Sequence, residues 1–188
     1  MRQGIAADAF LMRAGVTLSA MDPAMDSATD ASKHPISWPT DFVWGEPVPA
    51  PAGPGGKPGI VMFFNLECPG CISRGIPFLK RLESDYRGRI WTMLVHTSYG
   101  HRDLSRDEVV PTLRHFAESF ARLPMPVALD VDGTLAQDWG VEGTPHWFVF
   151  DGGGVLQRSV YGSQDNARTR LEYLIEELVL GAGSEKAS

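Results

Sequence analysis

The feature that most restricts the fold is an apolar run that leads into the only two cysteines of the chain. Residues 59–66 read Gly-Ile-Val-Met-Phe-Phe-Asn-Leu, and a Cys-Pro-Gly-Cys motif follows at 68–71. The five apolar residues 60–64 are typical of a central strand that is covered on both faces. If a helix begins at the motif, its N-terminal amides and dipole favour a thiolate on the first sulfur. A strand, a Cys-x-x-Cys motif and a helix in this order indicate a redox site.

The remaining patterns predict an α/β fold with a central mixed β-sheet and helices on both faces. The expected order is strand, helix, strand, helix, strand, short helix, hairpin and helix, with parallel pairing first and antiparallel pairing at the end. The segments that carry this prediction are an edge strand within 37–44, a Gly- and Pro-rich loop over 45–59, a helix with apolar positions 72, 76, 79 and 82, strands at 90–95 and 127–129, a hairpin of 147–150 and 155–161, and a closing helix around 171–179.

Two prolines complicate the helices. Pro77 falls inside the helix after the cysteines, where we expect a kink because proline removes one backbone hydrogen bond. Ser105 and Glu108 form a capping-box pattern ahead of another amphipathic helix. Pro111 leaves two alternatives open there, a break in the helix or a true start at the proline.

Composition limits the class of protein. The chain has 188 residues, enough for one well-buried core, and we divide it into an extension at 1–36, a domain at 37–181 and a flexible tail at 182–188. The net charge of −6 argues against nucleic acid as a partner. We expect no membrane span, because no stretch has the 18 or more apolar residues that a membrane helix needs. Asp8 and Arg13 interrupt the apolar residues near the start, so we expect a cytoplasmic protein unless a signal or the natural start is missing.

The two cysteines are expected to have different roles. Thiol–disulfide exchange needs an attacking thiolate and a second thiol that resolves the mixed disulfide. Cys68 would lie at or before the first helical turn, exposed and near unpaired amides, which makes it the attacking residue. Cys71 would face inward and resolve. Glu67 would oppose a thiolate on Cys68, whereas Arg74, one turn along, would favour it.

A second motif, Gly-Thr-Pro at 143–145, precedes the predicted hairpin. Its Thr–Pro bond is a candidate cis peptide, which would turn the backbone of Thr144 outward to pair with an extended substrate chain; an ordinary trans turn is the alternative. We expect Thr144 and Pro145, together with Pro69 and Gly70 of the tight turn, to form the surface that binds substrate.

These motifs resemble the thioredoxin superfamily, and in particular its TlpA-like and peroxiredoxin-like redoxin branch. The resemblance spans roughly residues 59–180. It is carried by the Cys-Pro-Gly-Cys motif after the apolar strand, the proline in the following helix, the segment 130–140 and the Gly-Thr-Pro motif. It implies a three-layer thioredoxin-like sandwich with Cys68 as nucleophile, Cys71 as resolving thiol and Pro145 as a cis proline packed beside them.

The sequence departs from that family at the site itself. Thioredoxins usually have a tryptophan before the first cysteine, and this chain has Glu67. The buried acid of thioredoxins corresponds to Met62, and the glutamate of TlpA-like helices corresponds to Arg74. The helix is also one residue longer between Cys71 and Pro77 than in most TlpA-like chains. Proton transfer to and from Cys71 would then depend on water or on a group that the sequence does not identify.

The cysteines also have two less specific interpretations. They could be an inert pair, or they could form half of a zinc site completed by two histidines. The five candidates are His34, His96, His101, His115 and His146. No second ligand pair has the usual spacing, so we expect no metal. His146 lies beside the predicted cis proline, but we interpret it as a strand residue with an ordinary partner.

The segment Asp-Val-Asp-Gly-Thr-Leu at 130–135 resembles the first motif of haloacid-dehalogenase-type phosphatases. That chemistry also needs a downstream lysine, and the only one is Lys186, near the end of the chain. The simpler interpretation is a turn in which Asp132 and Thr134 cap a short helix.

We therefore predict a monomeric thiol–disulfide oxidoreductase that acts on protein disulfides through the Cys68–Cys71 pair and needs no other cofactor. An external thiol reductant would restore the dithiol. A peroxidase is the second hypothesis, although Asn65 stands where peroxiredoxins have the Thr or Ser that holds the peroxide. A binding module with a structural or regulatory disulfide is the third.

Overall fold

The computed structural model describes residues 37–53 and 55–184, which form a six-stranded sheet with helices packed on it. In chain order the elements are β1 Phe42–Trp44, β2 Gly59–Phe64, η1 Cys71–Gly75, α1 Ile76–Asp85, β3 Trp91–Thr97, α2 Arg106–His115, η2 Phe116–Phe120, β4 Val127–Asp130, α3 Thr134–Asp138, β5 His146–Phe150, β6 Leu156–Tyr161 and α4 Asp165–Ser184. Here η marks a single π-helical turn. This order matches the predicted one.

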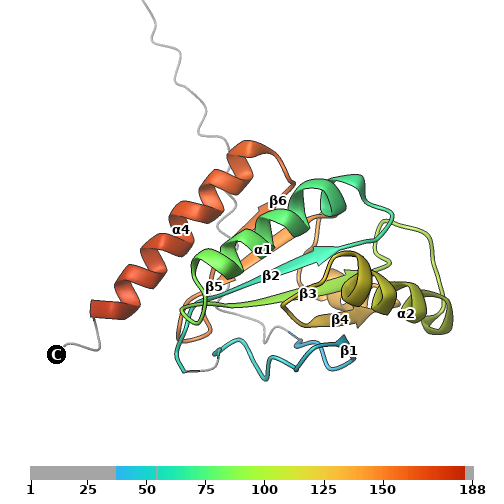
Figure 1. Cartoon of the computed structure of the whole chain (residues 1–188), viewed down its shortest axis with the longest axis horizontal. Coiled ribbons are helices and arrows are strands. Elements are labelled where there is room, and N and C mark those ends of the chain that lie inside the picture. The colour runs from blue at the N-terminus through green and yellow to red at the C-terminus, as the bar shows by residue number, and fades with distance from the viewer. Residues whose placement is uncertain (1–36, 54, 185–188) are drawn as a thin grey trace, which may run out of the picture.

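The strands lie in the order β1-β4-β3-β2-β5-β6 (Figure 1). The β2–β3 and β3–β4 pairs are parallel, whereas β5 runs antiparallel to β2 and to β6, and β1 pairs antiparallel with β4 at the edge. The predicted mixed sheet is therefore confirmed. Because β2 is central, the residues that follow it lie at the middle of the sheet's edge, between the loops after β3 and those before β5.

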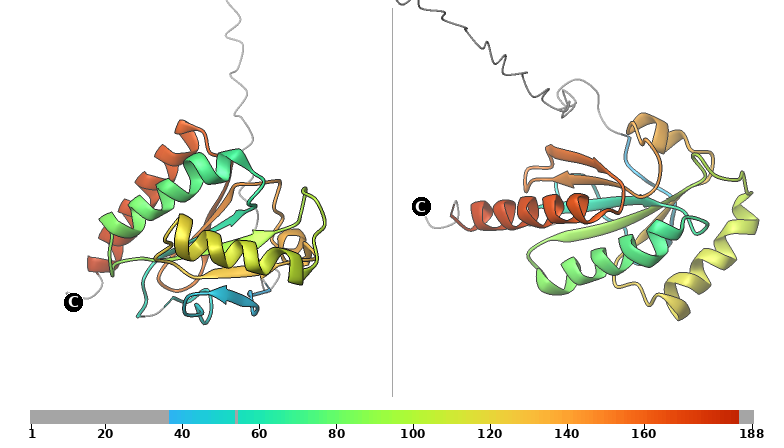
Figure 2. Two further views of the ribbon diagram at one scale, coloured as in Figure 1. Left: turned by 45° about the vertical axis from the view of Figure 1, so that its right-hand side comes forward. Right: turned by 90° about the horizontal axis from the view of Figure 1, so that it is seen from above.

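The sheet is covered on both faces, which gives three layers (Figure 2). Helices α1, α2 and α4 lie on one face, and α3 lies on the other with the segment before β2. Helices α1 and α4 run side by side and are joined by an ion pair between Arg81 and Glu172. The predicted thioredoxin-like sandwich is the observed architecture.

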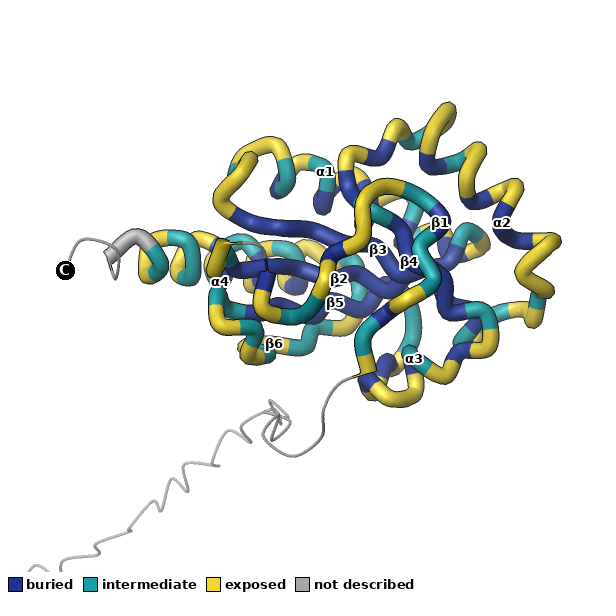
Figure 3. The backbone as a smooth tube through the Cα atoms, turned by 90° about the horizontal axis from the view of Figure 1, so that it is seen from below, coloured by how far each residue is buried: buried dark blue, intermediate teal, exposed yellow. Residues whose placement is uncertain are grey.

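Strand β2 fills both faces because its apolar residues alternate between them. Met62 and Phe64 pack against the three helices, while Val61 and Phe63 pack against α3 and the N-terminal segment. Every residue of β2 is buried (Figure 3). A buried strand of this kind holds the turn that follows it in one position.

The two prolines, Pro77 and Pro111, occupy different positions in their helices. Helix α2 begins after Ser105, whose side chain and backbone form the predicted capping box with Glu108, and Pro111 lies inside the helix. A start at Pro111 is therefore wrong. Pro77 lies in the first turn of α1, where a missing N–H costs little. The irregularity precedes it, because the Ile76 N–H bonds to the carbonyl of Cys71 in the π-helical turn η1.

A π-helical turn contains one more residue than an α-helical turn, which agrees with the extra residue between Cys71 and Pro77. Helix α4 includes residues 182–184, which the sequence assigned to the tail. The predicted extension at 1–36 and the rest of the tail lie outside the described residues. None of the helices in the described segments is long and apolar enough to cross a membrane.

Candidate active site

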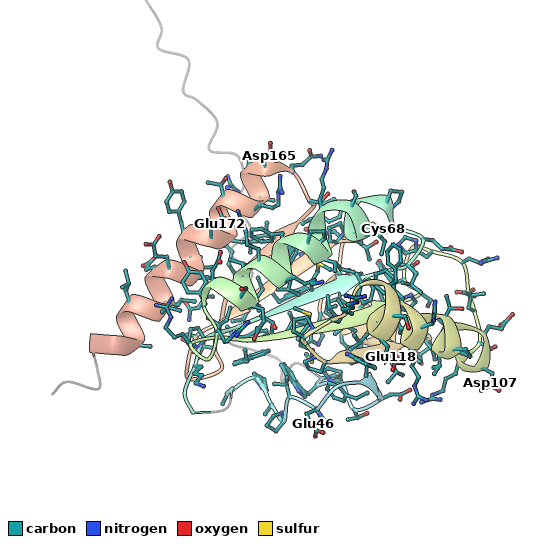
Figure 4. The ribbon with its side chains drawn as sticks, in the orientation of Figure 1. Glu46, Cys68, Asp107, Glu118, Asp165 and Glu172 are labelled. Carbon is teal, nitrogen blue, oxygen red and sulfur yellow. The ribbon has the colours of Figure 1, made fainter. Side chains whose placement is uncertain are left out.

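The cysteine motif begins where β2 ends, and hydrogen bonds fix its turn. The Cys68 N–H bonds to the carbonyl of Asn65 at 3.1 Å, and the Cys71 N–H bonds to the carbonyl of Cys68 at 3.1 Å. The buried side chain of Asn65 donates to the carbonyl of Thr97 at 2.7 Å and accepts from the N–H of Glu67 at 2.8 Å. Asn65 therefore ties the turn to the end of β3. Figure 4 labels Cys68 at the start of the helix formed by η1 and α1.

The two thiols are adjacent and differ in their exposure to solvent. Their sulfurs lie 2.7 Å apart, and the Cys71 thiol donates to the Cys68 sulfur. The backbone N–H of Cys71 donates to the same sulfur at 3.2 Å. Cys68 retains 8% of its surface and Cys71 none. Cys68 is therefore less exposed than we expected, but it is the only one of the two that solvent reaches, and a negative charge on it would face two donors.

Burial raises the pKa of the Cys71 thiol well above its usual value, and the hydrogen bond with Cys68 raises it further. The contacts with the backbone of Asn65 and with the side chain of Thr144 act in the opposite direction and are smaller. Cys71 therefore remains protonated at neutral pH. A thiol in this state is a poor nucleophile until its proton is removed.

The Gly-Thr-Pro motif lies against the sulfurs. The Thr144–Pro145 peptide bond is cis. The thiol of Cys68 donates to the carbonyl oxygen of Thr144 at 3.3 Å. A Cβ built on Gly70 would lie 3.9 Å from Cδ of Pro145 and 2.9 Å from Oγ of Ser163, so the turn approaches this peptide closely.

The predicted substrate-binding residues thus come together. Pro69 is exposed on the outer side of the turn, and its carbonyl accepts a hydrogen bond from Ser73 at 2.7 Å. Thr144 and Gly70 are half-buried, and Pro145 is buried. Pro69, Gly70, Thr144 and Pro145 therefore surround the partly exposed sulfur of Cys68.

The two predicted tuning residues differ in their surroundings. Glu67 forms an ion pair with Arg102, in which Nη2 lies 2.6 Å from Oε1. Arg74 is exposed on η1. The positive charge that offsets the negative charge of Glu67 therefore belongs to Arg102, a residue that the sequence did not point to.

His101 is the second residue that was missed. Its Nε2 lies 2.7 Å from Oγ1 of Thr144, and the side chain is half-buried. Burial lowers the pKa of His101, and the charge of Glu67 partly opposes this effect. The sequence offered one indirect indication of this contact. The loop 98–105 follows β3, and the carboxyl ends of the parallel neighbours β2 and β3 lie at the same edge of the sheet.

The other histidines have separate environments. His146 accepts from the N–H of Glu142 at 3.0 Å and pairs with Oγ of Ser159 at 2.7 Å, so it has ordinary partners, as we interpreted it. Burial lowers the pKa of His146 to about 4. His96 lies on β3, where Nε2 accepts from the N–H of Leu66 at 3.4 Å, and burial lowers its pKa to about 4 as well.

A cavity of about 340 Å³ lies beside the motif, between the ends of the central strands and α2. Its walls include Asn65, Leu66, Glu67, His96, Ser98, Arg102, Leu104, Glu108, Val109, Thr112, Leu129 and Val131. Among the described residues, no group of three His, Cys, Asp or Glu side chains is arranged to hold a metal ion.

The phosphatase-like segment has a structural role in the described fold. The buried carboxylate of Asp130 accepts hydrogen bonds from Thr97 and from the N–H groups of Leu135 and Ala136, and it thereby caps α3. Asp132 accepts a hydrogen bond from the N–H of Thr134 at 3.1 Å, as predicted for the turn, but Thr134 is the first residue of α3 and not a cap. Met62 is fully buried, and its sulfur would lie 3.0 Å from a Cβ placed on Gly75. The position that the resemblance equates with the buried acid of thioredoxins is therefore apolar in this chain.

Comparisons with solved structures identify the fold. A thiol-disulfide isomerase from Corynebacterium glutamicum has 22% identity and a TM-score of 0.62, covering 78% of this chain and 97% of its own. A putative thiol:disulfide interchange protein DsbE from Chlorobium tepidum has 18% identity and a TM-score of 0.56, with coverages of 75% and 97%. A thioredoxin-like protein from Porphyromonas gingivalis has 20% identity and a TM-score of 0.54, with coverages of 68% and 78%.

No protein-family model and no curated protein matches the sequence. The structural likeness agrees with the strand order and the three layers. The described part of this chain therefore has the thioredoxin-like fold.

Proposed function

We propose that the protein is a thiol–disulfide oxidoreductase that exchanges disulfides in protein substrates. The observation that carries this proposal is the contact of two unequal thiols, 2.7 Å apart, beside the Thr144 carbonyl. The structural neighbours include proteins described as a thiol-disulfide isomerase and a thiol:disulfide interchange protein, which supports the same chemistry. The Cys68–Cys71 disulfide is the only redox group that this reaction needs.

The first step is an attack by Cys68. Its thiolate attacks one sulfur of a substrate disulfide, forms a mixed disulfide and releases the other substrate sulfur as a thiolate. The N–H and S–H of Cys71 point at the Cys68 sulfur and stabilise its negative charge before the attack. The substrate chain would lie against Thr144 and Pro145, next to the Cys68 sulfur.

The second step is the attack of Cys71 on the Cys68 sulfur. It forms the Cys68–Cys71 disulfide and releases the second substrate thiolate, so the substrate gains two electrons and the protein loses two. An external dithiol then reverses this change in the protein. Because Cys71 is fully buried, it can attack the mixed disulfide on Cys68 but not a disulfide of a substrate in solution.

The test is catalysed reduction of insulin by dithiothreitol. We expect Cys68→Ser to abolish catalysis, and Cys71→Ser to accumulate a mixed disulfide that a reductant releases. Full activity in both variants would refute the proposal. A peroxidase would instead consume hydrogen peroxide at the expense of dithiothreitol. We expect no such activity, because the Asn65 side chain is engaged with Thr97 and Glu67.

A further inference from the structure

The resolving step requires that Cys71 lose a proton inside the protein. Burial raises the pKa of this thiol, so it does not ionise by itself near neutral pH. The buried position that carries an acid in thioredoxins is Met62, which cannot accept a proton. The groups that act on the Cys71 pKa are Cys68, Asn65 and Thr144, and none of them is a carboxylate. The proton must therefore pass to water or to a titratable group near the thiols.

Thr144 connects the sulfurs to a titratable side chain. Its carbonyl oxygen lies 3.3 Å from the Cys68 sulfur, which lies 2.7 Å from the Cys71 sulfur, and its side chain is one of the groups that lower the pKa of Cys71. On the other side, its hydroxyl lies 2.7 Å from Nε2 of His101. A hydroxyl both donates and accepts, so it can pass a proton from one neighbour to the other. His101 is half-buried and therefore retains contact with solvent.

We propose that His101 accepts the proton of Cys71 through the Thr144 hydroxyl during the resolving step. This inference rests on the proposed function, because it assigns a proton acceptor to the second step of that reaction. The Cys71 proton moves to Oγ1 of Thr144 while the Thr144 proton moves to Nε2 of His101. The resulting Cys71 thiolate bonds to Cys68, the bond from Cys68 to the substrate breaks, and the electron pair leaves with the substrate sulfur. His101 then loses its proton to solvent.

The charges around His101 fit this role. Glu67, before the motif, faces it and is paired with Arg102, and His96 of β3 is the other titratable group that interacts with it. The pKa of His101 is lower than usual, so the ring is neutral at pH 7 and able to accept a proton. The negative charge of Glu67 stabilises the imidazolium that forms. His101 touches neither sulfur and acts only through Thr144.

The experiment separates the two steps with 5,5′-dithiobis(2-nitrobenzoic acid) and the reduced protein. Attack by Cys68 releases one coloured thiolate at a rate that is proportional to the reagent concentration. Attack by Cys71 releases a second one at a rate that is independent of that concentration. Both phases are followed by stopped-flow absorbance between pH 5 and 9 in the wild type and the variants His101→Gln, Thr144→Val and Thr144→Ser. His115→Gln, which replaces an exposed histidine on α2, is the matched control.

In the wild type we expect the second phase to slow as pH falls through the pKa of His101 and to level off above it. His101→Gln and Thr144→Val should slow the second phase at pH 7 by about 100-fold, the lower end of what a general base contributes. Their second-phase rates should rise about tenfold per pH unit without a plateau, because hydroxide replaces the imidazole. Thr144→Ser keeps the hydroxyl and should keep the plateau, and His115→Gln should match the wild type.

The outcomes distinguish this inference from the proposed function. A wild type without a second phase would contradict the role of Cys71 and, with it, the relay. A normal second phase in His101→Gln and Thr144→Val would overturn the relay alone. Equal losses in both phases would assign His101 a structural role and would also overturn the relay. If His101→Gln does not fold, the Thr144→Val and Thr144→Ser pair gives the same test without changing the histidine.

Discussion

Replacement of Asp130 by asparagine tests how much the hydrogen bonds of this buried carboxylate stabilise the fold next to the site. The carboxylate accepts three hydrogen bonds: 2.7 Å from Thr97 Oγ1, and 3.0 Å from each of the N–H groups of Leu135 and Ala136. These bonds join the end of β3 to the start of α3. The segment that carries His101 follows β3, and the segment that carries Thr144 follows α3. Loss of the carboxylate should therefore affect stability first and the site second.

The magnitude follows from the number of donors. An asparagine side chain accepts at only one of its two ends, so at least one N–H of α3 would face an NH₂ group. Leaving a buried donor unpaired costs about 1–3 kcal/mol, and exchanging a charged acceptor for a neutral one costs about 1 kcal/mol more for each remaining bond. With two bonds remaining, the expected loss for Asp130→Asn is about 3–5 kcal/mol, which corresponds to a fall in Tm of about 6–20 °C in a chain of this size.

The assay is urea denaturation at pH 7 with Asp132→Asn as the control. Asp132 is an exposed carboxylate on the same turn, so its variant should lose less than about 1 kcal/mol. For Asp130→Asn we expect a lower midpoint with an unchanged slope. A loss below about 1 kcal/mol would refute the reasoning. Metal-dependent hydrolysis of phosphate esters that is lost in this variant would favour the phosphatase-like interpretation instead.

Three further predictions concern acid sensitivity, charge and packing. The pKa of His146 and of His96 is about 4 in the folded protein, below the usual 6.5, so the unfolded state takes up protons first as pH falls. Stability should be full above pH 6.5 and should fall between pH 6.5 and 4, by up to about 2 kcal/mol per histidine at pH 5. His146→Gln should remove part of this loss in urea titrations at pH 7.5 and 5, and an unchanged acid sensitivity would contradict the assignment. Glu67→Gln removes a negative charge beside the attacking cysteine and should speed the first phase about two- to tenfold at low salt, with less effect at 1 M salt; a slower first phase would show that the ion pair orders the turn. Gly59→Ala would place a Cβ 1.8 Å from the ring of Trp91, and thermal unfolding should show a loss of about 1–3 kcal/mol or more, whereas an unchanged Tm would mean that the ring relocates freely.

Local patterns explain why most of the fold could be predicted. The apolar run of β2 has no polar side that could face solvent, which fixes it as a central strand. The capping box at Ser105 marked the start of α2 correctly, even though Pro111 follows in the helix interior. The hairpin of β5 and β6 was evident from its glycine-rich turn. In each case the deciding interactions lie within a few residues of one another.

The site could be predicted only where motifs mark it. Cys68, Cys71 and Thr144 belong to short motifs, and the topology brings those motifs together. His101 and Arg102 lie in a loop without a motif, and their partners are 43 and 35 residues away in the chain. The path of that loop depends on long-range packing, so the sequence could not identify these contacts. The near burial of Cys68 was missed for the same reason, since its contact with the Thr144 carbonyl is also long-range in the chain.

The reduction potential of the Cys68–Cys71 pair shows whether the two thiols act as one exchangeable redox pair. The protein is equilibrated in dithiothreitol or glutathione buffers, and the fraction of free thiol is measured by alkylation and mass spectrometry. We expect a reversible two-electron transition within one chain, at a potential between about −300 and −120 mV, as in proteins that exchange disulfides. A pair that stays oxidised in all of these buffers, or that oxidises only by linking two chains, would rule out disulfide exchange by Cys68 and Cys71.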